Sequence, residues 1–137
     1  MRHIEILAEV PDNVCRLLRI DTTERAVMMS QGTVSHIFEQ RSFHDAAMIV
    51  GVLARGDLNP VYCGRDLVYP RTFFIVEASG VGIDAWVKIV LKPVMAPSSA
   101  SRHDEIWVVT AHRVVDSTLN RMLIGNRFVM YRTTRDR

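Results

Sequence analysis

Apolar residues recur along the first half of the chain with the spacing of a helix. After Ser30, and again after Asp45, they lie three and four positions apart. Serine and aspartate are favoured at a helix N-terminus, because their side-chain oxygens accept hydrogen bonds from its free amides. The pattern predicts one helix over residues 30–41 and a second over residues 45–54.

The second half of the chain is rich in β-branched and aromatic residues, in short segments separated by turn residues. Such segments predict consecutive antiparallel strands. They cover residues 61–62, 72–78, 85–91 and 106–115, with a loop over 93–102. We also expect a strand over 3–10, an element of unassigned type over 15–20 and a helix over 117–123. Helices followed by a run of strands favour an α+β fold over a doubly wound parallel sheet.

The chain of 137 residues is 48% hydrophobic and fits one globular domain. We divide it into an N-terminal extension (1–26), a core (27–124) and a basic C-terminal tail (125–137). No secretory signal is recognised at the start, and the longest apolar run, Ala46–Ala54, is much shorter than the ~20 residues of a membrane-spanning helix. We therefore expect a cytoplasmic protein, in its own cell or delivered to a target cell, without a membrane partner.

The charge is small overall but uneven along the chain. The net charge is +2, and the cations are Arg except for Lys88 and Lys92. Residues 107–137 contain six arginines and two aspartates, a net charge of +4. Because the guanidinium group binds phosphate with a planar fork of donors, this basic end is the expected contact with a polyanion.

Motifs for metals, cofactors and nucleophilic hydrolases are missing from the sequence. The two cysteines, Cys15 and Cys63, have neither the number nor the spacing of a zinc site or a disulfide framework. There is no His-Glu-x-x-His, no P-loop and no Gly-x-Ser-x-Gly. We expect no metal and no cofactor.

Strand alternation sorts the polar side chains by face, since successive residues point to opposite sides of a sheet. Lys88 and Lys92 share one face of their strand. In the next strand, uninterrupted alternation groups Thr110 and His112 with Val108. If the two strands pair, a polar strip of lysine, threonine and histidine could bind a phosphodiester, although a solvated sheet face would carry the same residue types.

Four segments in this order carry a resemblance to a known family. They are Val34–Arg41 (VSHIFEQR), Asn59-Pro60, Ala85–Val90 (AWVKIV) and Ile106–Arg113 (IWVVTAHR). They resemble the phage-associated branch of the barnase–EndoU–colicin–RelE nuclease superfamily, over roughly residues 27–122. The resemblance implies N-terminal helices packed on a four-stranded antiparallel sheet, and a toxin-like ribonuclease that needs no metal.

The resemblance also implies the residues that would cleave RNA. A helix histidine, a basic strand residue and a late Ser or Thr correspond to His36, Lys88 and Thr110. Many relatives have a second histidine where this chain has Arg41, so the base is either His36 or the later His44. It would deprotonate the ribose 2′-hydroxyl, which attacks phosphorus and leaves a 2′,3′-cyclic phosphate. The candidate catalytic residues are His36, His44, Lys88, Thr110 and His112, the last as the acid for the leaving 5′ oxygen.

Further cations and aromatic rings are candidates for binding the substrate. Arginine and lysine would neutralise phosphates, and Trp86 or Tyr131 would stack a base. The candidate substrate-binding residues are Arg41, Lys92, Arg113, Arg121 and Tyr131. The expected partners are RNA, with tRNA among the candidates, and an acidic antitoxin or immunity protein that covers the arginine-rich end.

Two other functions compete with the ribonuclease. A catalytically silent binding module, such as an immunity or adaptor protein, would use the same sheet face, and it predicts that His36, Lys88 and Thr110 do not converge. An ADP-ribosyltransferase has less support, because no convincing set of Arg, Ser-Thr-Ser and Glu-x-Glu is present.

Overall fold

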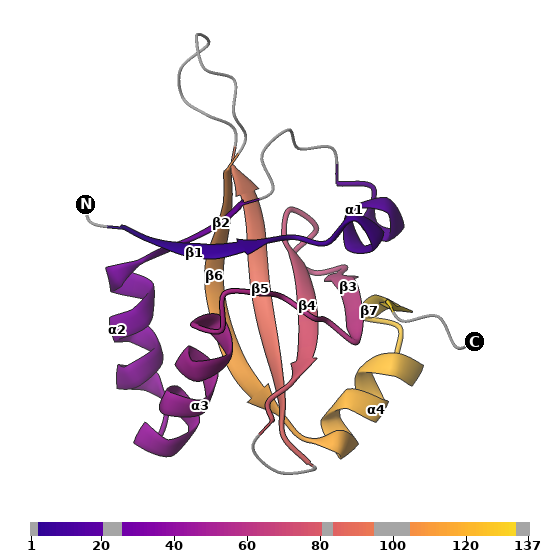
Figure 1. Ribbon diagram of the computed structural model, residues 1–137. Coiled ribbons are helices and arrows are strands. Elements are labelled where there is room, and N and C mark those ends of the chain that lie inside the picture. The colour runs from indigo at the N-terminus through magenta and orange to yellow at the C-terminus, as the bar shows by residue number, and fades with distance from the viewer. Residues whose placement is uncertain (1–2, 21–25, 81–83, 95–104, 134–137) are drawn as a thin grey trace, which may run out of the picture.

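The structure, a computed structural model, describes residues 3–20, 26–80, 84–94 and 105–133 (Figure 1). In chain order the elements are β1 (His3–Glu9), α1 (Asp12–Leu18), β2 (Ala26–Ser30), α2 (Gln31–Gln40), α3 (Phe43–Leu53), β3 (Tyr62–Asp66), β4 (Phe73–Ala78), β5 (Trp86–Val94), β6 (Glu105–Val114), α4 (Asp116–Ile124) and β7 (Phe128–Arg132). The predicted helices at 30–41, 45–54 and 117–123 are confirmed, and so is the strand at 3–10. Most of the predicted loop 93–102 lies outside the described residues.

The strands form one mixed sheet of seven, in the order β1-β2-β6-β5-β4-β3-β7. Neighbouring strands are antiparallel except β2 and β6, which are parallel. The chain combines helices and strands as an α+β protein does, but the predicted architecture, N-terminal helices on a four-stranded antiparallel sheet, is wrong. The additional strands are β1, β2 and β7.

Two of these strands arise where the sequence pattern gave no strand. β2 is five residues long and is followed without a break by α2. β7 lies in the segment expected to be a basic tail, and it pairs with β3 over its full length, from Phe128 opposite Asp66 to Arg132 opposite Tyr62. Because this pairing joins segments more than sixty residues apart, local periodicity does not reveal it.

The sheet is curled, so that the segment after one edge strand reaches the opposite edge. In Figure 1, β1 runs across the front of the sheet towards α1. The α1 helix, where an element of unassigned type was expected, contacts β3. Arg65 Nη2 donates to the Leu18 carbonyl at 2.7 Å, and Asn13 Nδ2 donates to the Thr133 carbonyl at 3.0 Å. These bonds attach the N-terminal segment to the β3–β7 edge.

The helix starts follow from capping residues. Ser30 caps α2 as predicted, because its Oγ accepts from the Thr33 amide at 3.1 Å. The cap of α3 is Ser42 rather than the predicted Asp45, whose amide donates to Ser42 Oγ at 3.2 Å. Asp45 instead lies in the first turn, where a negative charge is favourable to the helix dipole.

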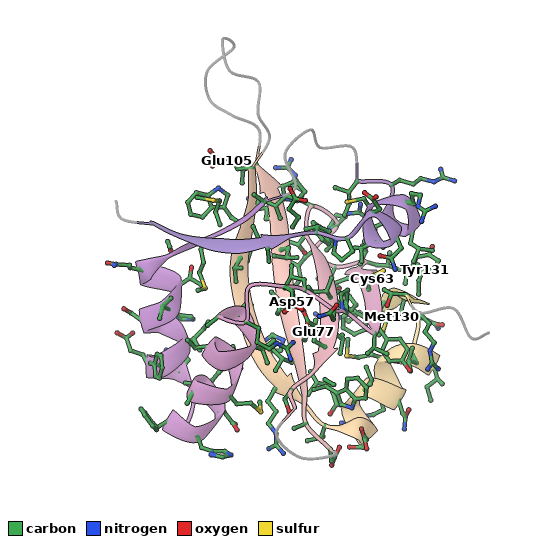
Figure 2. The ribbon with its side chains drawn as sticks, in the orientation of Figure 1. Asp57, Cys63, Glu77, Glu105, Met130 and Tyr131 are labelled. Atoms are coloured by element: carbon green, nitrogen blue, oxygen red, sulfur yellow. The ribbon has the colours of Figure 1, made fainter. Side chains whose placement is uncertain are left out.

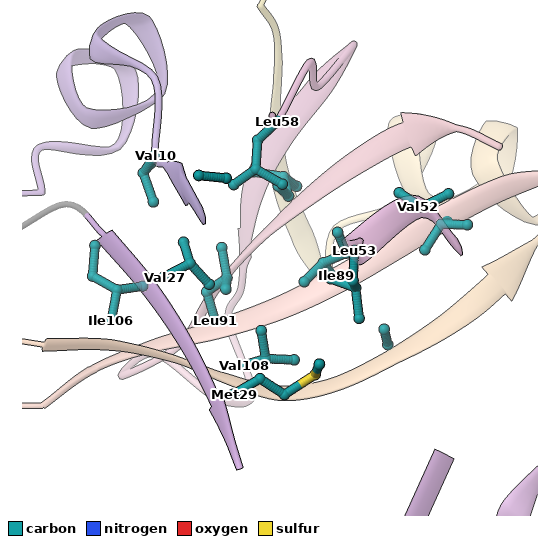
Figure 3. Close-up of a cluster of buried hydrophobic side chains, with 14 of the residues drawn as sticks. Val10, Val27, Met29, Val52, Leu53, Leu58, Ile89, Leu91, Ile106 and Val108 are labelled. Carbon is teal, nitrogen blue, oxygen red and sulfur yellow. The ribbon is translucent and has the colours of Figure 1, made fainter. Parts of the chain in front are cut away.

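The two faces of the sheet have different coverings. The core face carries Val87, Ile89 and Leu91 of β5, and these side chains belong to one large buried cluster with residues of α1, α2 and α3 (Figure 3). The opposite face, which we call the pocket face because a cavity is hollowed into it, carries Lys88 and Val90 of the same strand. A smaller cluster there joins residues of β4 and β6 to α4. The pocket face is therefore the less completely covered one.

Candidate functional site

An irregularity in β6 sets the direction of its polar side chains. Val90 of β5 pairs with Thr110, and the next residue, Leu91, pairs with Val108, so Val109 is left without a partner in β5. Such a β-bulge shifts the alternation of side chains by one residue. The expected grouping of Thr110 and His112 with Val108 is therefore wrong, because Val108 lies in the core cluster.

The bulge turns Thr110 and His112 to the pocket face, beside the lysine of the neighbouring strand. His112 is directly opposite Lys88 in the register, and Thr110 is opposite Val90. All four residues line a cavity of about 540 Å³, which we call the sheet pocket. Its polar lining residues are Asp66, Tyr69, Thr72, Lys88, Thr110, His112, Arg113, Thr118 and Arg127, and its apolar ones are Phe74, Val90, Val109, Val114, Met122 and Phe128.

Lys88 is held between two aromatic rings at the floor of the pocket. Its Nζ lies 4.8 Å from the ring centroids of both Phe74 and Phe128, within the range of a cation–π interaction. Burial lowers the pKa of Lys88, and Arg127 adds to this effect, while Asp66 opposes it. The ammonium group is thus poorly solvated and positioned by its surroundings.

Arg41 reaches the pocket from the other side of the sheet. It directly follows α2, whose Ile37 is buried in the core cluster. Its Nη2 donates to Thr110 Oγ1 at 3.4 Å and contacts His112 Nδ1 at 3.3 Å. This route is open because β2 pairs only with the first half of β6, at Ile106 and Trp107.

The contact with Arg41 fixes the state of His112. A guanidinium group can only donate, so Nδ1 accepts and the ring proton of neutral His112 lies on Nε2. Burial first, then the positive charges of Lys88 and Arg41, lower the pKa of His112 to about 4. In the free protein His112 is therefore a neutral imidazole at pH 7, with Nε2–H as a hydrogen-bond donor.

A single carboxylate lies among these cations, and it is already paired. Arg127 donates to both oxygens of Asp66, with Nη2 to Oδ2 at 2.8 Å. These hydrogen bonds are the main reason that the pKa of Asp66 is lowered. With Lys88 and Arg127 in the lining and Arg41 at its edge, the sheet pocket has an excess of positive charge that suits an anion.

The structure brings together half of the residues expected at a site. Lys88, Thr110, His112 and Arg113 line the sheet pocket, and Arg41 contacts two of them. Lys92 lines a second hollow that adjoins the first. The predicted strip of lysine, threonine and histidine is thus present, although through the bulge rather than through regular alternation.

The other expected residues lie elsewhere. His36 and His44 are exposed on α2 and α3, and neither lines the sheet pocket. Arg121 is exposed on α4, where it donates to Thr118. Tyr131 lies on β7 and lines a different hollow, next to α1 (Figure 2). Trp86 also lies outside the pocket lining and donates to Asp116.

Several residues of the pocket had no recognisable signal in the sequence. Asp66 ends β3 and Tyr69 lies in the turn after it, whereas Arg127 and Phe128 come from the segment expected to be a tail. The pair of Asp66 and Arg127 joins positions 61 residues apart. Only the unpredicted β3–β7 pairing places them together.

The described part of the chain offers neither a metal-binding cluster nor a membrane-spanning helix. No group of three or more histidine, cysteine, aspartate or glutamate side chains in it could hold a metal ion. Within the same residues, no helix is long and apolar enough to span a membrane.

Comparison with known proteins found no family model, no curated protein and no solved structure that matches the chain. The resemblance to the nuclease superfamily therefore remains a prediction from the sequence.

Proposed function

We propose that the protein is an endoribonuclease that binds RNA in the sheet pocket and cleaves it with its own side chains, without a metal ion. The observation that carries this proposal is the convergence of Lys88, Thr110, His112 and Arg41 on one cavity. Cations, a hydroxyl and an imidazole are the groups that bind a phosphodiester and move its protons.

The walls of the pocket suit a nucleotide as well as its phosphate. Phe74, Phe128 and Met122 provide apolar surface next to Lys88. Binding sites of a few hundred Å³ commonly combine such walls with a few convergent polar groups, and the volume of about 540 Å³ lies in this range. A base would pack on the apolar side while the phosphate contacts the cations.

His112, rather than His36 or His44, is then the general base. In the free protein Arg41 covers its Nδ1 lone pair. A bound phosphate attracts the guanidinium group of Arg41, which frees Nδ1, and its negative charge raises the pKa of His112. The phosphate of the substrate thus both releases Nδ1 of His112 from Arg41 and makes His112 a stronger base.

The reaction would be an internal transesterification. His112 Nδ1 takes the proton of the ribose 2′-hydroxyl, and the 2′ oxygen forms a bond to phosphorus. The bond from phosphorus to the 5′ oxygen breaks, and that oxygen takes a proton from the Lys88 ammonium, whose lowered pKa makes it a better acid. Arg41 and Thr110 donate to the non-bridging oxygens, where negative charge develops. The product is a 2′,3′-cyclic phosphate.

A binding module without catalysis is the second candidate, and two observations favour it. The pKa of His112 is about 4, and Arg41 occupies its accepting nitrogen, so the free protein offers a weak base at neutral pH. In addition, His36 lies apart from Lys88 and Thr110, and a silent module predicts that these three residues do not converge. Such a module would bind the anion and release it unchanged.

The two functions are separated by a cleavage assay. Purified protein is incubated with a single-stranded RNA in EDTA, and the fragment ends are mapped. We expect cleavage that leaves 2′,3′-cyclic phosphates and falls by about 10²-fold or more in His112→Ala. His36→Ala is the matched control, because it removes an exposed histidine outside the pocket, and it should cleave at the wild-type rate.

The outcomes are distinct. Intact RNA with the wild-type protein, together with binding of an oligonucleotide that needs Lys88, would favour the binding module. Loss of cleavage in His36→Ala but not in His112→Ala would overturn the assignment of the base.

A further inference from the structure

A second hollow adjoins the sheet pocket on the same face. Its volume is about 370 Å³, and it shares Tyr69, Thr72 and Val109 with the sheet pocket. Arg71 and Lys92 complete its polar lining. Since three residues line both cavities, the two hollows lie next to each other. We call the second hollow the outer subsite.

Tyr69 lines both cavities, and its exposed ring is carried by a hydrogen-bonded turn. Its exposed fraction is 60%. The backbone around it is held by the Tyr69 amide, which donates to the Asp66 carbonyl at 3.0 Å, and by the Thr72 amide and hydroxyl, which both donate to the Tyr69 carbonyl. An exposed ring on a rigid turn is a suitable platform for stacking a base.

The charges of the outer subsite are complementary to a second phosphate. Arg71 and Lys92 line it, and none of the described residues in its lining is acidic. Lys88 and Lys92 point to the same face of β5, four residues and therefore about 13 Å apart along the strand. Because Lys88 is held between Phe74 and Phe128, the two cations fit successive units of a polyanion.

We propose that the outer subsite binds the nucleotide next to the scissile phosphate of a single-stranded RNA, with its base stacked on Tyr69 and its phosphate on Arg71 and Lys92. The inference rests on the proposed function for its substrate class. Single-stranded rather than paired RNA fits, because a base can lie on the Tyr69 ring only when it is free of its own stack.

Binding of uncleavable oligonucleotides tests the outer subsite without any need for catalysis. The probes are a dithymidylate and a tetrathymidylate with 2′-deoxyribose, measured by isothermal titration calorimetry at fixed salt. We expect the tetranucleotide to bind at least tenfold more tightly than the dinucleotide. Tyr69→Ala should lower tetranucleotide affinity about tenfold, and the double change Arg71→Ala with Lys92→Ala should act on the tetranucleotide alone.

Matched variants separate stacking from unspecific effects. Tyr69→Phe keeps the ring and should bind the tetranucleotide like the wild type. Tyr131→Ala removes a tyrosine that is also exposed but lies in a different hollow, and it should leave both affinities unchanged. Hexaglutamate serves as the probe for an acidic peptide, and tighter binding of it than of the tetranucleotide would replace RNA as the occupant.

The failure of this inference differs from that of the proposed function. Equal affinity for both oligonucleotides, with RNA still cleaved in EDTA, would overturn the outer subsite alone. A length-dependent affinity that needs Tyr69, with RNA left intact, would support the subsite and overturn the nuclease. If neither oligonucleotide binds at millimolar concentration, the outer subsite is refuted whatever the cleavage assay gives.

Discussion

The two faces of the sheet are built from the same strands but are organised differently. On the core face, side chains of β5 and β6 lie under α1, α2 and α3 in one continuous apolar cluster. On the pocket face, α4 covers one end with a small cluster, and the rest of the surface is hollowed and rich in cations. Most of the buried apolar surface thus lies on the core face. Desolvating the charges of the pocket face costs free energy, and burial of the large core offsets this cost.

The charged side chains also differ between the two faces of the sheet. On the core face, the buried Glu77 carboxylate forms an ion pair with Arg55, which donates to it and is itself partly exposed. Figure 2 shows Glu77, next to the last residue of β4, near Asp57 of the segment between α3 and β3. On the pocket face, by contrast, several cations share one paired carboxylate. A charge on the core face is matched, whereas the pocket face has an excess of one sign, as expected of a surface that binds an anion.

Replacing Lys88 with methionine should have the largest effect, and only on function. Methionine keeps the contact with Phe74 and Phe128 but removes the charge. We expect RNA cleavage to fall by about 10³-fold, since the acid that protonates the leaving 5′ oxygen is lost, while the Tm does not decrease because a desolvated cation has been removed. Arg121→Met, on the outside of α4, is the control. Normal cleavage by Lys88→Met would disprove the role of the ammonium group.

Ile89→Ala tests the residue next to Lys88 in β5, which points to the core face and is 1% exposed. Deleting so much buried hydrocarbon should lower the free energy of unfolding by about 2–5 kcal/mol. The cleavage rate per folded molecule should stay within twofold of the wild type at a temperature well below the lowered Tm. Urea unfolding and initial rates measure the two quantities. A stable variant with lost activity would contradict the division between the faces.

Arg55→Met tests the ion pair of the core face. It leaves the Glu77 carboxylate buried without its partner, and we expect about 2 kcal/mol of destabilisation at pH 7. Burial already raises the pKa of Glu77 above its ordinary value. Protonation of Glu77 therefore favours the folded state as the pH falls, and the difference from the wild type should shrink towards pH 4.5. Urea unfolding at both pH values measures it, and a difference independent of pH would refute this explanation.

The smallest effect is expected from the pH dependence of stability at His112. Its pKa is about 4 in the folded protein, below the ordinary value of 6.5. Between these values the unfolded chain binds the extra proton, so acidification destabilises the fold. From pH 7 to 4.5 the wild type should lose about 1–2 kcal/mol more than His112→Gln, whose side chain does not titrate. Parallel stability curves for the two proteins would show that the pKa of His112 is not lowered.

The sequence predicts those parts of the fold that depend on neighbours along the chain. The Ser30 cap, the apolar spacing in α3 and the β-branched runs in β4 to β6 are local signals, and their elements form as expected. β7 could not be predicted in this way, because its pairing with β3 is fixed by contacts across the fold. The predicted number of strands was therefore too low at this edge of the sheet.

The candidate site was predictable in its residue types but not in its geometry. The sequence predicts a polar strip of Lys88 or Lys92 with Thr110 and His112, and the structure places Lys88, Thr110 and His112 in one pocket. The unpaired Val109 that turns two of them to the correct face has no sequence signature, since a bulge is a property of the register between strands. His36 was expected from a family resemblance, and its helix presents it to solvent.

The most direct measurement of the central claim is the titration of the His112 imidazole by NMR, with and without saturating dithymidylate. Comparison with His112→Gln assigns its signal among the five histidines. We predict a pKa of about 4 in the free protein and a rise of about one unit or more in the complex, because the phosphate adds opposite charge beside the ring. Binding of the dinucleotide with an unchanged His112 titration would show that the anion lies elsewhere, and it would contradict the sheet pocket as the site of function.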